Sequence, residues 1–468
     1  MLTSGFRAIR DRHLEAAAAT DLALWALRGL SALDPLLEAE QRDGVLRLGL
    51  SGRDIAQRRA GDRPGEAAAA LAWLFDAAWD ASPVLRRGGA DRMVQAAYDE
   101  IFNHLDPYSR YVPADEAEAA RERRLGVAGA GIEVEAGPRG SVVVAAVAPN
   151  SPAARAGVRA GDRLLAADGR SVSPTRLEPL RALLEGESPG NLRLLLLRGR
   201  TRVSAVLRRA VAIAPSVQAE RRGDLLLLRI GSFTAGTADQ LAGLLRRNLQ
   251  SGARGRPPQG LVLDLRGNRG GLLREGVAVA ATFLDDGPVG RTEGRHPDAL
   301  RRWESAGPDL AEGRPLVVLV DGRTASSSEI VSAALSDRRR AVVVGSTTMG
   351  KGLIQILVPM PNGAELSLSW SRILAPDGWP LQGLGVIPAV CTSLSEEATR
   401  RQVARLEQGE APMAAVLARQ RAARAPVLAS EVVALRGACP PAEGREADGQ
   451  VAQALLARPE LYRAAIGP

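Results

Sequence analysis

Lys351 is the residue whose type and context most strongly indicate chemistry in this chain. Lysine and arginine together number 61, and Lys351 is the single lysine among them. Arginine keeps its proton in proteins, whereas a desolvated lysine can lose it and act as a base. Because arginine supplies the cationic charge everywhere else, this lysine is a candidate for the one task that arginine cannot perform. The alternative is that one lysine survives by chance.

A serine at the start of a predicted helix is the matching nucleophile. The apolar run Leu316–Val320 predicts a buried strand, and a helix is predicted to begin at Ser326 after a short turn. The next predicted strand, at 341–344, returns the loop that holds Lys351 to the same end of a parallel sheet. A serine hydroxyl is a weak nucleophile without a base, and a lysine made neutral by burial can be that base.

Three further features complete the predicted site. Gln355 lies four residues after Lys351 in a predicted strand, so its amide oxygen is expected to face the lysine and orient it. Gly270 and Gly271 follow another buried strand, and paired glycines let backbone amides approach a substrate oxyanion. The helix that begins at Ser326 presents N-terminal N–H groups, which favour developing negative charge.

Each of these features also has a plainer interpretation. Serines at positions 326–328 are typical helix caps, and paired glycines are typical of a tight turn. Lys351 is also a candidate phosphate ligand, but its loop lacks the spacing of a phosphate-binding loop. The combination on neighbouring strand ends is what favours acyl transfer, in which Ser326 attacks a carbonyl and Lys351 takes its proton.

The rest of the sequence divides into regions that position this site. Apolar residues recur at helical spacing through 1–115, and strands with two short helices are predicted over 116–212. Strands alternate with helices over 213–398, which is typical of an α/β fold. Residues 399–468 are rich in alanine and arginine and are predicted to be helical.

The motifs around these residues resemble the carboxyl-terminal processing, or tail-specific, serine peptidases. The similar segments are T-A-S-S-S-E-I at 324–330, G-S-T-T-M-G-K-G at 345–352 with Gln355, V-L-D-L-R at 262–266, G-G-L-L at 270–273, L-D-P-Y-S at 105–109, P-D-G at 376–378 and Q-G-L-G-V at 382–386. The resemblance spans roughly 100–392 and implies a crotonase-like or ClpP-like protease core with an inserted PDZ domain. It implies roles for Ser326 (nucleophile), Lys351 (base), Gln355 (lysine-orienting amide) and the amides of Gly270, Gly271 and Ser327 (oxyanion hole).

The resemblance extends to the middle module, which is similar to the PDZ domain of that family. Gly129, Ala130, Gly131 and Ile132 occupy the position of the carboxylate-binding loop, and the neighbouring strand edge is expected to accept a peptide by β-augmentation. The implied partners are proteins and peptides with apolar C-termini, an activating adaptor and further copies of the chain. A β-module without a ligand is the alternative.

The implied function is a serine endopeptidase that cleaves proteins recognised by their C-terminal tail, through a Ser–Lys acyl-enzyme and without metal or cofactor. Two alternatives are a catalytically silent PDZ scaffold and a crotonase-like acyl hydrolase that acts on small molecules. Intact Ser326, Lys351 and Gln355 argue against the scaffold, and the PDZ-like module argues against the small-molecule hydrolase.

Composition excludes several other classes. The net charge is +8, but arginine is dispersed and not interleaved with aromatic residues, which argues against nucleic-acid binding. No apolar run reaches the ~18 residues that span a bilayer. The three histidines, His13, His104 and His296, lie far apart and show no metal-binding spacing. Cys391 and Cys439 either pair in an oxidising compartment or serve as small buried side chains.

The expected location follows from the resemblance rather than from the N-terminus. The family resemblance implies a periplasmic or cell-envelope enzyme. The first residues are polar and contain no apolar signal segment, so a cytoplasmic location is the alternative.

Overall fold

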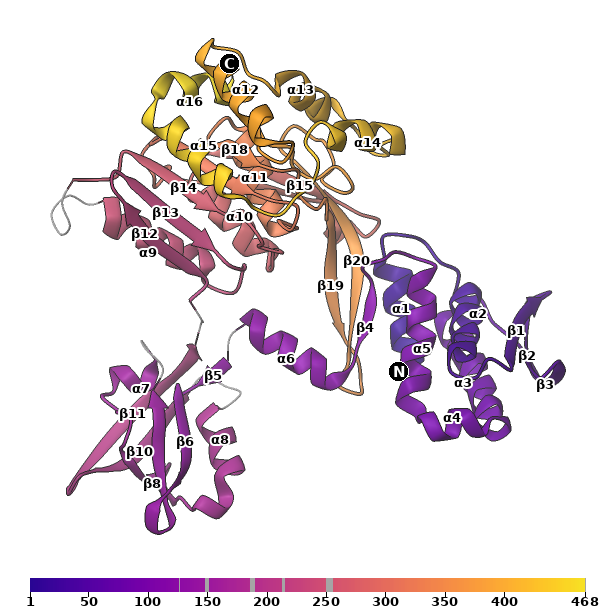
Figure 1. Cartoon of the computed structure of the whole chain (residues 1–468). Helices are drawn as coiled ribbons and strands as arrows, with labels where there is room; N and C mark the ends of the chain where they lie inside the picture. The colour runs from indigo at the N-terminus through magenta and orange to yellow at the C-terminus, as the bar shows by residue number, and fades with distance from the viewer. Residues whose placement is uncertain (126, 148–150, 186–189, 213–214, 250–255, 468) are drawn as a thin grey trace. The chain divides into compact units, whose positions relative to one another are not determined.

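The computed structural model describes the chain except residues 126, 148–150, 186–189, 213–214, 250–255 and 468 (Figure 1). The chain divides into two units. Unit 1 comprises Met1–Ala119, Ser216–Phe233 and Thr237–Pro468, and unit 2 comprises Ala120–Pro215 and Thr234–Gly236.

A six-stranded sheet forms the centre of unit 1, in the order β12-β13-β14-β17-β18-β21. The strands are β12 (Val217–Arg222), β13 (Leu225–Ile230), β14 (Gly260–Asp264), β17 (Leu316–Val320), β18 (Val342–Gly345) and β21 (Val390–Cys391). All pairs are parallel except β12 with β13. Strands β14, β17 and β18 are buried along their whole length, as their continuous apolar runs predict for a parallel sheet covered on both faces.

Helices cover both faces of this sheet. Successive side chains of a strand point to opposite faces, so a continuous apolar run needs a packing partner on each face. One face packs against α9 (Thr237–Leu249), α10 (Leu273–Ala281) and α11 (Ser327–Asp337). The other face packs against helices from the end of the chain (Figure 1). The C-terminal helices are α12 (Glu396–Glu407), α13 (Ala414–Ala422), α14 (Ala429–Gly437), α15 (Glu446–Ala457) and α16 (Pro459–Ile466), which agrees with the helical pattern of that region.

A second sheet of unit 1 carries the strand that follows Lys351. Its order is β16-β15-β20-β19, and β4 pairs with β20. The strands are β4 (Arg110–Val112), β15 (Gly287–Glu293), β16 (Arg301–Ser305), β19 (Leu353–Pro359) and β20 (Glu365–Leu374), and a 3-10 turn at Pro297–Ala299 precedes β16. The sequence analysis had predicted β19 but not β20, its partner strand.

The N-terminal region differs from the prediction that it is helical. Its helices are α1 (Leu2–Arg12), α2 (Ala19–Gly29), α3 (Pro64–Ala81), α4 (Pro83–Gly88) and α5 (Ala90–Asn103), with a 3-10 turn at Leu30–Ala32. Between α2 and α3 lies a three-stranded antiparallel sheet of β1 (Leu37–Arg42), β2 (Val45–Leu50) and β3 (Arg53–Arg59). The all-helical expectation was wrong here because Asp43-Gly44 and Ser51-Gly52 adopt positive φ angles and form tight hairpin turns.

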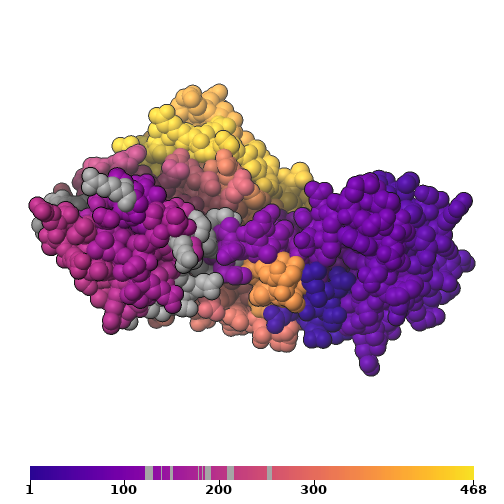
Figure 2. Space-filling model, turned by 90° about the horizontal axis from the view of Figure 1, so that it is seen from below, coloured from indigo at the N-terminus to yellow at the C-terminus, as the bar shows by residue number. Residues whose placement is uncertain are grey.

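The β19–β20 hairpin packs against these N-terminal helices. Leu366 and Leu368 of β20 share one buried cluster with the N-terminal core, as does Tyr111 of β4. The backbone N–H of Leu14 donates to the carbonyl of Ser369 at 2.8 Å. In Figures 1 and 2 the orange hairpin accordingly lies beside the indigo N-terminal residues. The segment after Lys351 is thus supported by residues more than 200 positions earlier in the chain.

Unit 2 is a small β-module. Its strands are β5 (Val127–Gly129), β6 (Ile132–Gly137), β7 (Ser141–Val147), β8 (Arg163–Ala167), β9 (Arg170–Ser171), β10 (Gly190–Arg198) and β11 (Thr201–Ala212), with helices α7 (Pro152–Arg155) and α8 (Leu177–Glu185) and 3-10 turns at Pro138–Gly140 and Pro174–Arg176. The sheet order is β5-β11-β10-β8-β7-β6, and β9 pairs with β8. Helix α6 (Ala114–Leu125) leads into it from unit 1. Ser151 caps α7 by accepting from the N–H of Ala154.

Among the described residues, no helix combines the length and the apolar character needed to cross a bilayer.

Candidate active site

Ser326 lies at the sharp turn between β17 and α11. Its φ is 58° and its ψ is −119°, a strained conformation for a residue with a side chain. The turn leaves Ser326 partly exposed, whereas Ser327 and Ser328 are buried. Ser327 donates its hydroxyl to the carbonyl of Gly271, and Ser328 donates to that of Asn268. Of the three consecutive serines, Ser326 is therefore the one that a substrate can reach.

The paired glycines lie directly against this serine. A Cβ atom on Gly270 would come within 2.7 Å of the Ser326 Cβ, so only glycine fits there at its φ of +94°. The N–H of Gly270 donates to Asn268 Oδ1 at 2.8 Å. To bind an oxyanion as predicted, the Gly270 N–H would have to give up or share this hydrogen bond to Asn268.

The amides of Gly271 and Ser327 are better placed to bind an oxyanion. Neither N–H donates to an acceptor within the described part of the chain. Ser327 is the first residue of α11, so its N–H has no acceptor within the helix. The Gly271 carbonyl accepts from Ser327 Oγ, which places the two residues side by side.

The loop that carries Lys351 comprises residues 348–352 and is called the lysine loop below. It follows β18 and reaches the Ser326 turn, because the N–H of Met349 donates to the carbonyl of Thr324 at 3.0 Å. The βαβ connection from β17 through α11 to β18 produces this proximity, as predicted.

Glu329 joins the two loops. Its Oε2 accepts from the backbone N–H of Ser326 at 2.8 Å and from that of Lys351 at 2.9 Å. Its Oε1 accepts from Gly350 N–H at 2.7 Å and from the Thr348 hydroxyl at 2.5 Å. Burial raises the pKa of this carboxyl group, and these four hydrogen bonds act in the opposite direction.

Glu329 belongs to the motif at 324–330 and had no predicted role. Its position three residues after Ser326 is the S-x-x-E spacing of a capping box, in which the acidic side chain returns to the backbone N–H of the first residue. That spacing was the available signal for its structural role. Its hydrogen bonds to the lysine loop required the tertiary structure.

The Lys351 side chain is half-buried beside the segment that leads into β4. Its Nζ lies 5.3 Å from the centroid of the Tyr108 ring. Burial lowers the lysine pKa, the positive charge of Arg110 lowers it further, and the Glu329 charge opposes them. The motif at 105–109, which the sequence analysis noted without a role, therefore contributes to the surroundings of the lysine.

Gln355 is oriented by its neighbours. Its Nε2 donates to the carbonyl of Leu353 at 3.1 Å and to Ser369 Oγ at 3.2 Å. Because a carbonyl can only accept, the nitrogen side of the amide is identified, and Oε1 is left to accept from another donor. The structure records no hydrogen bond from Lys351 Nζ to Gln355 or to Ser326 among the described residues, so the orienting role of Gln355 stays a prediction.

Behind Gln355 lies a buried polar network that sequence reasoning missed. Ser369 Oγ donates to Asp106 Oδ1 at 2.8 Å, and His13 Nε2 lies 2.8 Å from Asp106 Oδ2. Two backbone N–H groups and Ser109 Oγ also donate to this carboxylate, and these contacts, led by the one with His13, hold the pKa of Asp106 well below its usual value despite burial. An ionised Asp106 fixes the direction of the Ser369 hydroxyl and thereby supports Gln355.

The predicted carboxylate-binding loop lies in unit 2. The N–H of Ala130 donates to the carbonyl of Leu184 in α8 at 2.8 Å, so this amide is already engaged. Gly131 has a positive φ of 69°. Ile132 begins β6, which is the edge strand of its sheet and packs against α8. A free edge strand beside a helix is the arrangement that β-augmentation requires.

Comparisons with known proteins match two parts of this chain to described families. Residues 224–391 match the family described as Peptidase family S41, and residues 143–198 match the PDZ domain. The carboxy-terminal-processing protease of Bartonella bacilliformis is 32% identical over 304 residues, which cover 64% of this chain and 69% of the relative. The chloroplastic C-terminal processing peptidase of Tetradesmus obliquus is 33% identical over 337 residues, covering 65% and 70%. Among solved structures, the photosystem II D1 C-terminal processing protease is 26% identical with a TM-score of 0.38, covering 83% of this chain and 97% of that one.

The family matches define a serine peptidase with a PDZ domain, and the structure shows its α/β core, as the sequence motifs predicted. The chain belongs to the carboxy-terminal-processing proteases of peptidase family S41. Membership in a peptidase family also argues against the silent-scaffold alternative. Within the described residues, no cluster of His, Cys, Asp or Glu side chains is arranged to hold a metal ion.

Proposed function

We propose that Ser326 and Lys351 form the catalytic dyad of this peptidase. The observation that carries the proposal is the Glu329 carboxylate, because one of its oxygen atoms accepts from the backbone N–H groups of both residues. The backbones of nucleophile and base are thereby held within a hydrogen bond of the same atom. The half-buried lysine, whose pKa burial lowers, is suited to deprotonate a hydroxyl.

The reaction is acyl transfer in two steps. Neutral Lys351 takes the proton of Ser326 Oγ as this oxygen bonds to the scissile carbonyl carbon, and the oxyanion is stabilised by backbone amides. The C–N bond then breaks, and the leaving amine takes the proton from Lys351. Water, deprotonated by Lys351, then attacks the acyl carbon, the C–Oγ bond breaks, and Lys351 returns the proton to Ser326 Oγ. The amides of Gly271 and Ser327 serve as the main oxyanion donors, with Gly270 shaping the turn.

Gln355 completes the site as the group that orients the lysine. Its Oε1 is the free end of an amide whose nitrogen is bound to Leu353 and Ser369. A movement of the Lys351 side chain from the Tyr108 ring towards Gln355 and Ser326 brings the dyad together when substrate binds.

The substrates are proteins and peptides presented by their apolar C-terminal tails. The PDZ domain supports this proposal, because β6 is an edge strand packed beside helix α8 and can pair with an extended peptide. The residues around Gly129–Ile132 hold the terminal carboxylate, with the Ala130 amide engaged elsewhere. An activating adaptor and a homo-oligomer stay predictions.

The enzyme acts in the periplasm or cell envelope. The Cys391–Cys439 disulfide supports this location, because disulfides persist in oxidising compartments.

A tail-bearing protein substrate tests the dyad directly. Ser326→Ala and Lys351→Arg are expected to abolish cleavage, because the first removes the nucleophile and the second replaces the base with a group that keeps its proton. Ser328→Ala, which removes a hydroxyl bound to the Asn268 carbonyl, is the matched control and retains cleavage. Cleavage by Lys351→Arg at the wild-type rate would disprove the dyad.

A further inference from the structure

The chain beyond the family match contacts the loops of the proposed active site. We call residues 392–468 the C-terminal extension, since the S41 match ends at residue 391. The N–H of Gly322 in the turn before Ser326 donates to the carbonyl of Ala442 at 2.7 Å. Ser346, two residues before the lysine loop, donates its hydroxyl to the same carbonyl. The extension therefore fastens the ends of both β17 and β18.

Arg436, in the last turn of α14, makes the most direct of these contacts. Its Nη1 donates to the carbonyls of Thr348 at 3.0 Å, Leu384 at 2.9 Å and Gly383 at 3.3 Å. The side chain is half-buried, and within the described residues no carboxylate forms an ion pair with it. A cation held by carbonyls alone is costly to bury, so its position calls for a reason beyond surface charge.

The three carbonyls belong to two loops that pack backbone against backbone. Thr348 begins the lysine loop, and the N–H of Gly383 donates to the carbonyl of Gly350 at 2.9 Å. The N–H of Gly352 donates to Gln382 Oε1 at 2.9 Å. Because one guanidinium nitrogen binds carbonyls from both loops, Arg436 holds the lysine loop against its neighbour.

The charge of Arg436 meets a second requirement of the site. Glu329 is fully buried, and its negative charge opposes the neutral form of Lys351 that a base requires. Lys351 cannot both balance this carboxylate as a cation and serve as a neutral base. Arg436 binds the carbonyl of Thr348, whose hydroxyl donates to Glu329, so its charge lies one residue away from this carboxylate. Because arginine keeps its proton, Arg436 can balance the carboxylate permanently. The other charged or titratable groups that face Lys351 are Arg110 and Tyr108.

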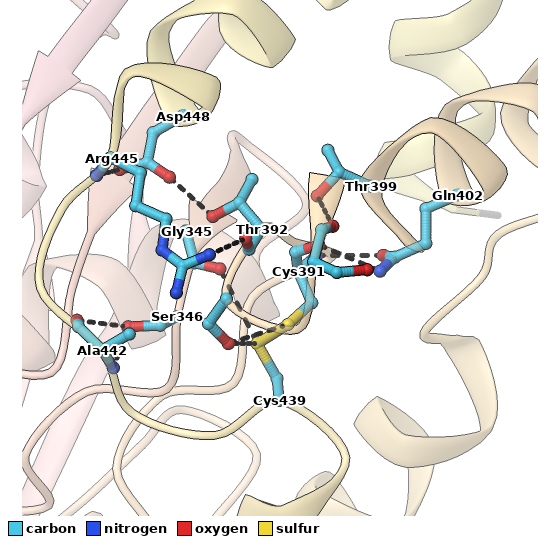
Figure 3. The surroundings of a disulfide bond; sticks show 12 residues. Gly345, Ser346, Cys391, Thr392, Thr399, Gln402, Cys439, Ala442, Arg445 and Asp448 are labelled. Atoms are coloured by element: carbon cyan, nitrogen blue, oxygen red, sulfur yellow. Dashed lines mark hydrogen bonds between the residues drawn. A yellow bond between two sulfur atoms is a disulfide. The ribbon is translucent and has the colours of Figure 1, made fainter. Parts of the chain in front are cut away.

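A disulfide anchors the end of α14 in this position. Cys439, three residues after Arg436, bonds to Cys391 at the end of β21 (Figure 3). Figure 3 also shows Ser346 hydrogen-bonded to Ala442 beside this bond. The guanidinium group is thus carried by a helix whose C-terminal end is covalently tied to the central sheet.

We propose that Arg436 is a positioning residue for the Ser–Lys dyad, which holds the carbonyls of the lysine loop and balances the buried Glu329. The proposal rests on the proposed function, because it assigns Arg436 an effect on the base. The effect differs from general support of the fold, since it predicts a change in the pH at which the enzyme becomes active.

The test compares Arg436→Met with Arg419→Met in the full chain, using a tail-bearing peptide substrate across a pH series. Arg419 lies in α13, is exposed and pairs with Glu431, so its substitution removes an arginine from the same extension without touching the loops. For Arg436→Met we expect kcat to fall at least about tenfold with KM within about twofold, because a base misplaced by a fraction of an ångström loses rate. The pH at which kcat/KM rises is expected to increase by about one unit. The reason is that the unbalanced negative charge of Glu329 stabilises protonated Lys351 and raises its pKa. Arg419→Met matches the wild type in both.

A second variant separates charge from geometry. Arg436→Lys keeps the positive charge but has a single nitrogen without the planar fork. Arg436→Lys is expected to keep the wild-type pH dependence of kcat/KM and to show a kcat between those of the wild type and Arg436→Met. It also provides the test if Arg436→Met does not fold. A lowered kcat in Arg436→Met with an unchanged pH dependence would overturn the balancing role, and wild-type kinetics would overturn the whole proposal.

The outcomes also distinguish this proposal from the dyad itself. If Lys351→Arg retains activity, the dyad assignment fails, whatever Arg436 does. If Lys351→Arg is inactive and Arg436→Met behaves like the wild type, only the role of Arg436 fails.

Discussion

The turn that carries Ser326 and the loop that carries Lys351 are held in different ways. We call residues 321–328 the nucleophile turn. Thr324 donates its hydroxyl to the carbonyl of Leu265, and Ala325 donates its N–H to that of Asn268. Asp321 accepts from the N–H of Gly267. These partners all lie in the segment that follows the adjacent parallel strand β14, so the sheet itself positions the nucleophile.

The lysine loop depends on partners that are distant in sequence. Glu329 of α11 accepts from its backbone, Gln382 accepts from Gly352, and Arg436 of the C-terminal extension donates to Thr348. The lysine side chain itself lies beside Tyr108 from the N-terminal region. The nucleophile turn is therefore held mainly by the core, with Gly322 and Asp321 also hydrogen-bonded to the C-terminal extension. The lysine loop depends on contacts from α11, from Gln382, from the extension and from the N-terminal region. Substitutions far from Ser326 should therefore act through Lys351.

Glu329→Gln is the largest expected perturbation, because it affects both segments. The amide NH₂ of glutamine replaces one carboxylate oxygen, so either the hydrogen bonds from Ser326 and Lys351 N–H or the one from Gly350 N–H are lost. We expect kcat to fall by more than about 100-fold, as displaced catalytic groups do. Steady-state kinetics on a folded variant, checked by circular dichroism, measure this. Activity within a few fold of the wild type would show that the shared carboxylate does not align the dyad.

Ser369→Ala tests the network behind Gln355. The alanine leaves one Gln355 N–H without its acceptor and frees Asp106 from one donor, so Gln355 loses its fixed orientation. We expect kcat to fall about tenfold with KM unchanged, less than the roughly 100-fold or more that a general acid–base group itself contributes, because Ser369 acts only through Gln355.

Ser371→Ala is the matched control for that variant. Ser371 lies two residues further along β20, is equally buried, and its Oγ has no hydrogen-bond partner in the described part of the chain. Its substitution should leave kcat unchanged. Equal effects of the two alanine variants would mean that strand packing, rather than the Asp106 network, governs the rate.

Removal of the disulfide affects the lysine loop more weakly, through α14. A Cys391→Ser, Cys439→Ser double variant opens a link across 48 residues, for which chain entropy predicts a stability loss of about 4 kcal/mol. Because Arg436 still has its three carbonyls, kcat should fall only a few fold, by about two- to fivefold. Urea unfolding and kinetics on the same samples test both. An unchanged unfolding midpoint contradicts the anchoring role.

Asp337→Asn has the smallest expected effect on the reaction. It tests whether a substitution in α11 away from both the nucleophile turn and the lysine loop changes stability without changing kcat. Burial, and then the charge of Asp377, raise the pKa of Asp337 to about 6, while it accepts from Trp379 Nε1. Because the folded pKa exceeds the unfolded value of 3.8, the folded protein binds more protons between these values, and stability falls as pH rises through about 6.

The size of that fall is on the order of 3 kcal/mol. In Asp337→Asn this loss should be absent, with kcat at neutral pH unchanged, since Asp337 lies at the opposite end of α11 from Ser326. Urea unfolding at pH 4.5 and 7.5 for both proteins provides the measurement. A wild-type stability that increases over this interval in step with the variant would contradict the assignment.

The sequence predicted the nucleophile side of the site well because that side is local. The strands β17 and β18 and the position of Ser326 at the start of α11 follow from apolar runs and turn residues that lie next to one another in the chain. The carboxyl ends of parallel strands then bring the two loops together by geometry alone.

The support of the base could not be predicted in the same way. Strand β20, which provides Ser369, pairs antiparallel with β19 and was missed, as were β1 to β3. Arg436 carries no local signal, because its carbonyl partners lie 52 or more residues earlier and arginine is frequent throughout the chain. The pairing of Cys391 with Cys439 was left open because two cysteines alone do not fix a bond.

Labelling with a serine-directed fluorophosphonate probe, read out by peptide mass spectrometry, tests the dyad most directly. We predict a single modified residue, Ser326, in the wild type, labelling that increases as pH rises through the pKa of Lys351, and no labelling in Lys351→Arg. Modification of another serine, or undiminished labelling in Lys351→Arg, would contradict the assignment of the nucleophile and its base.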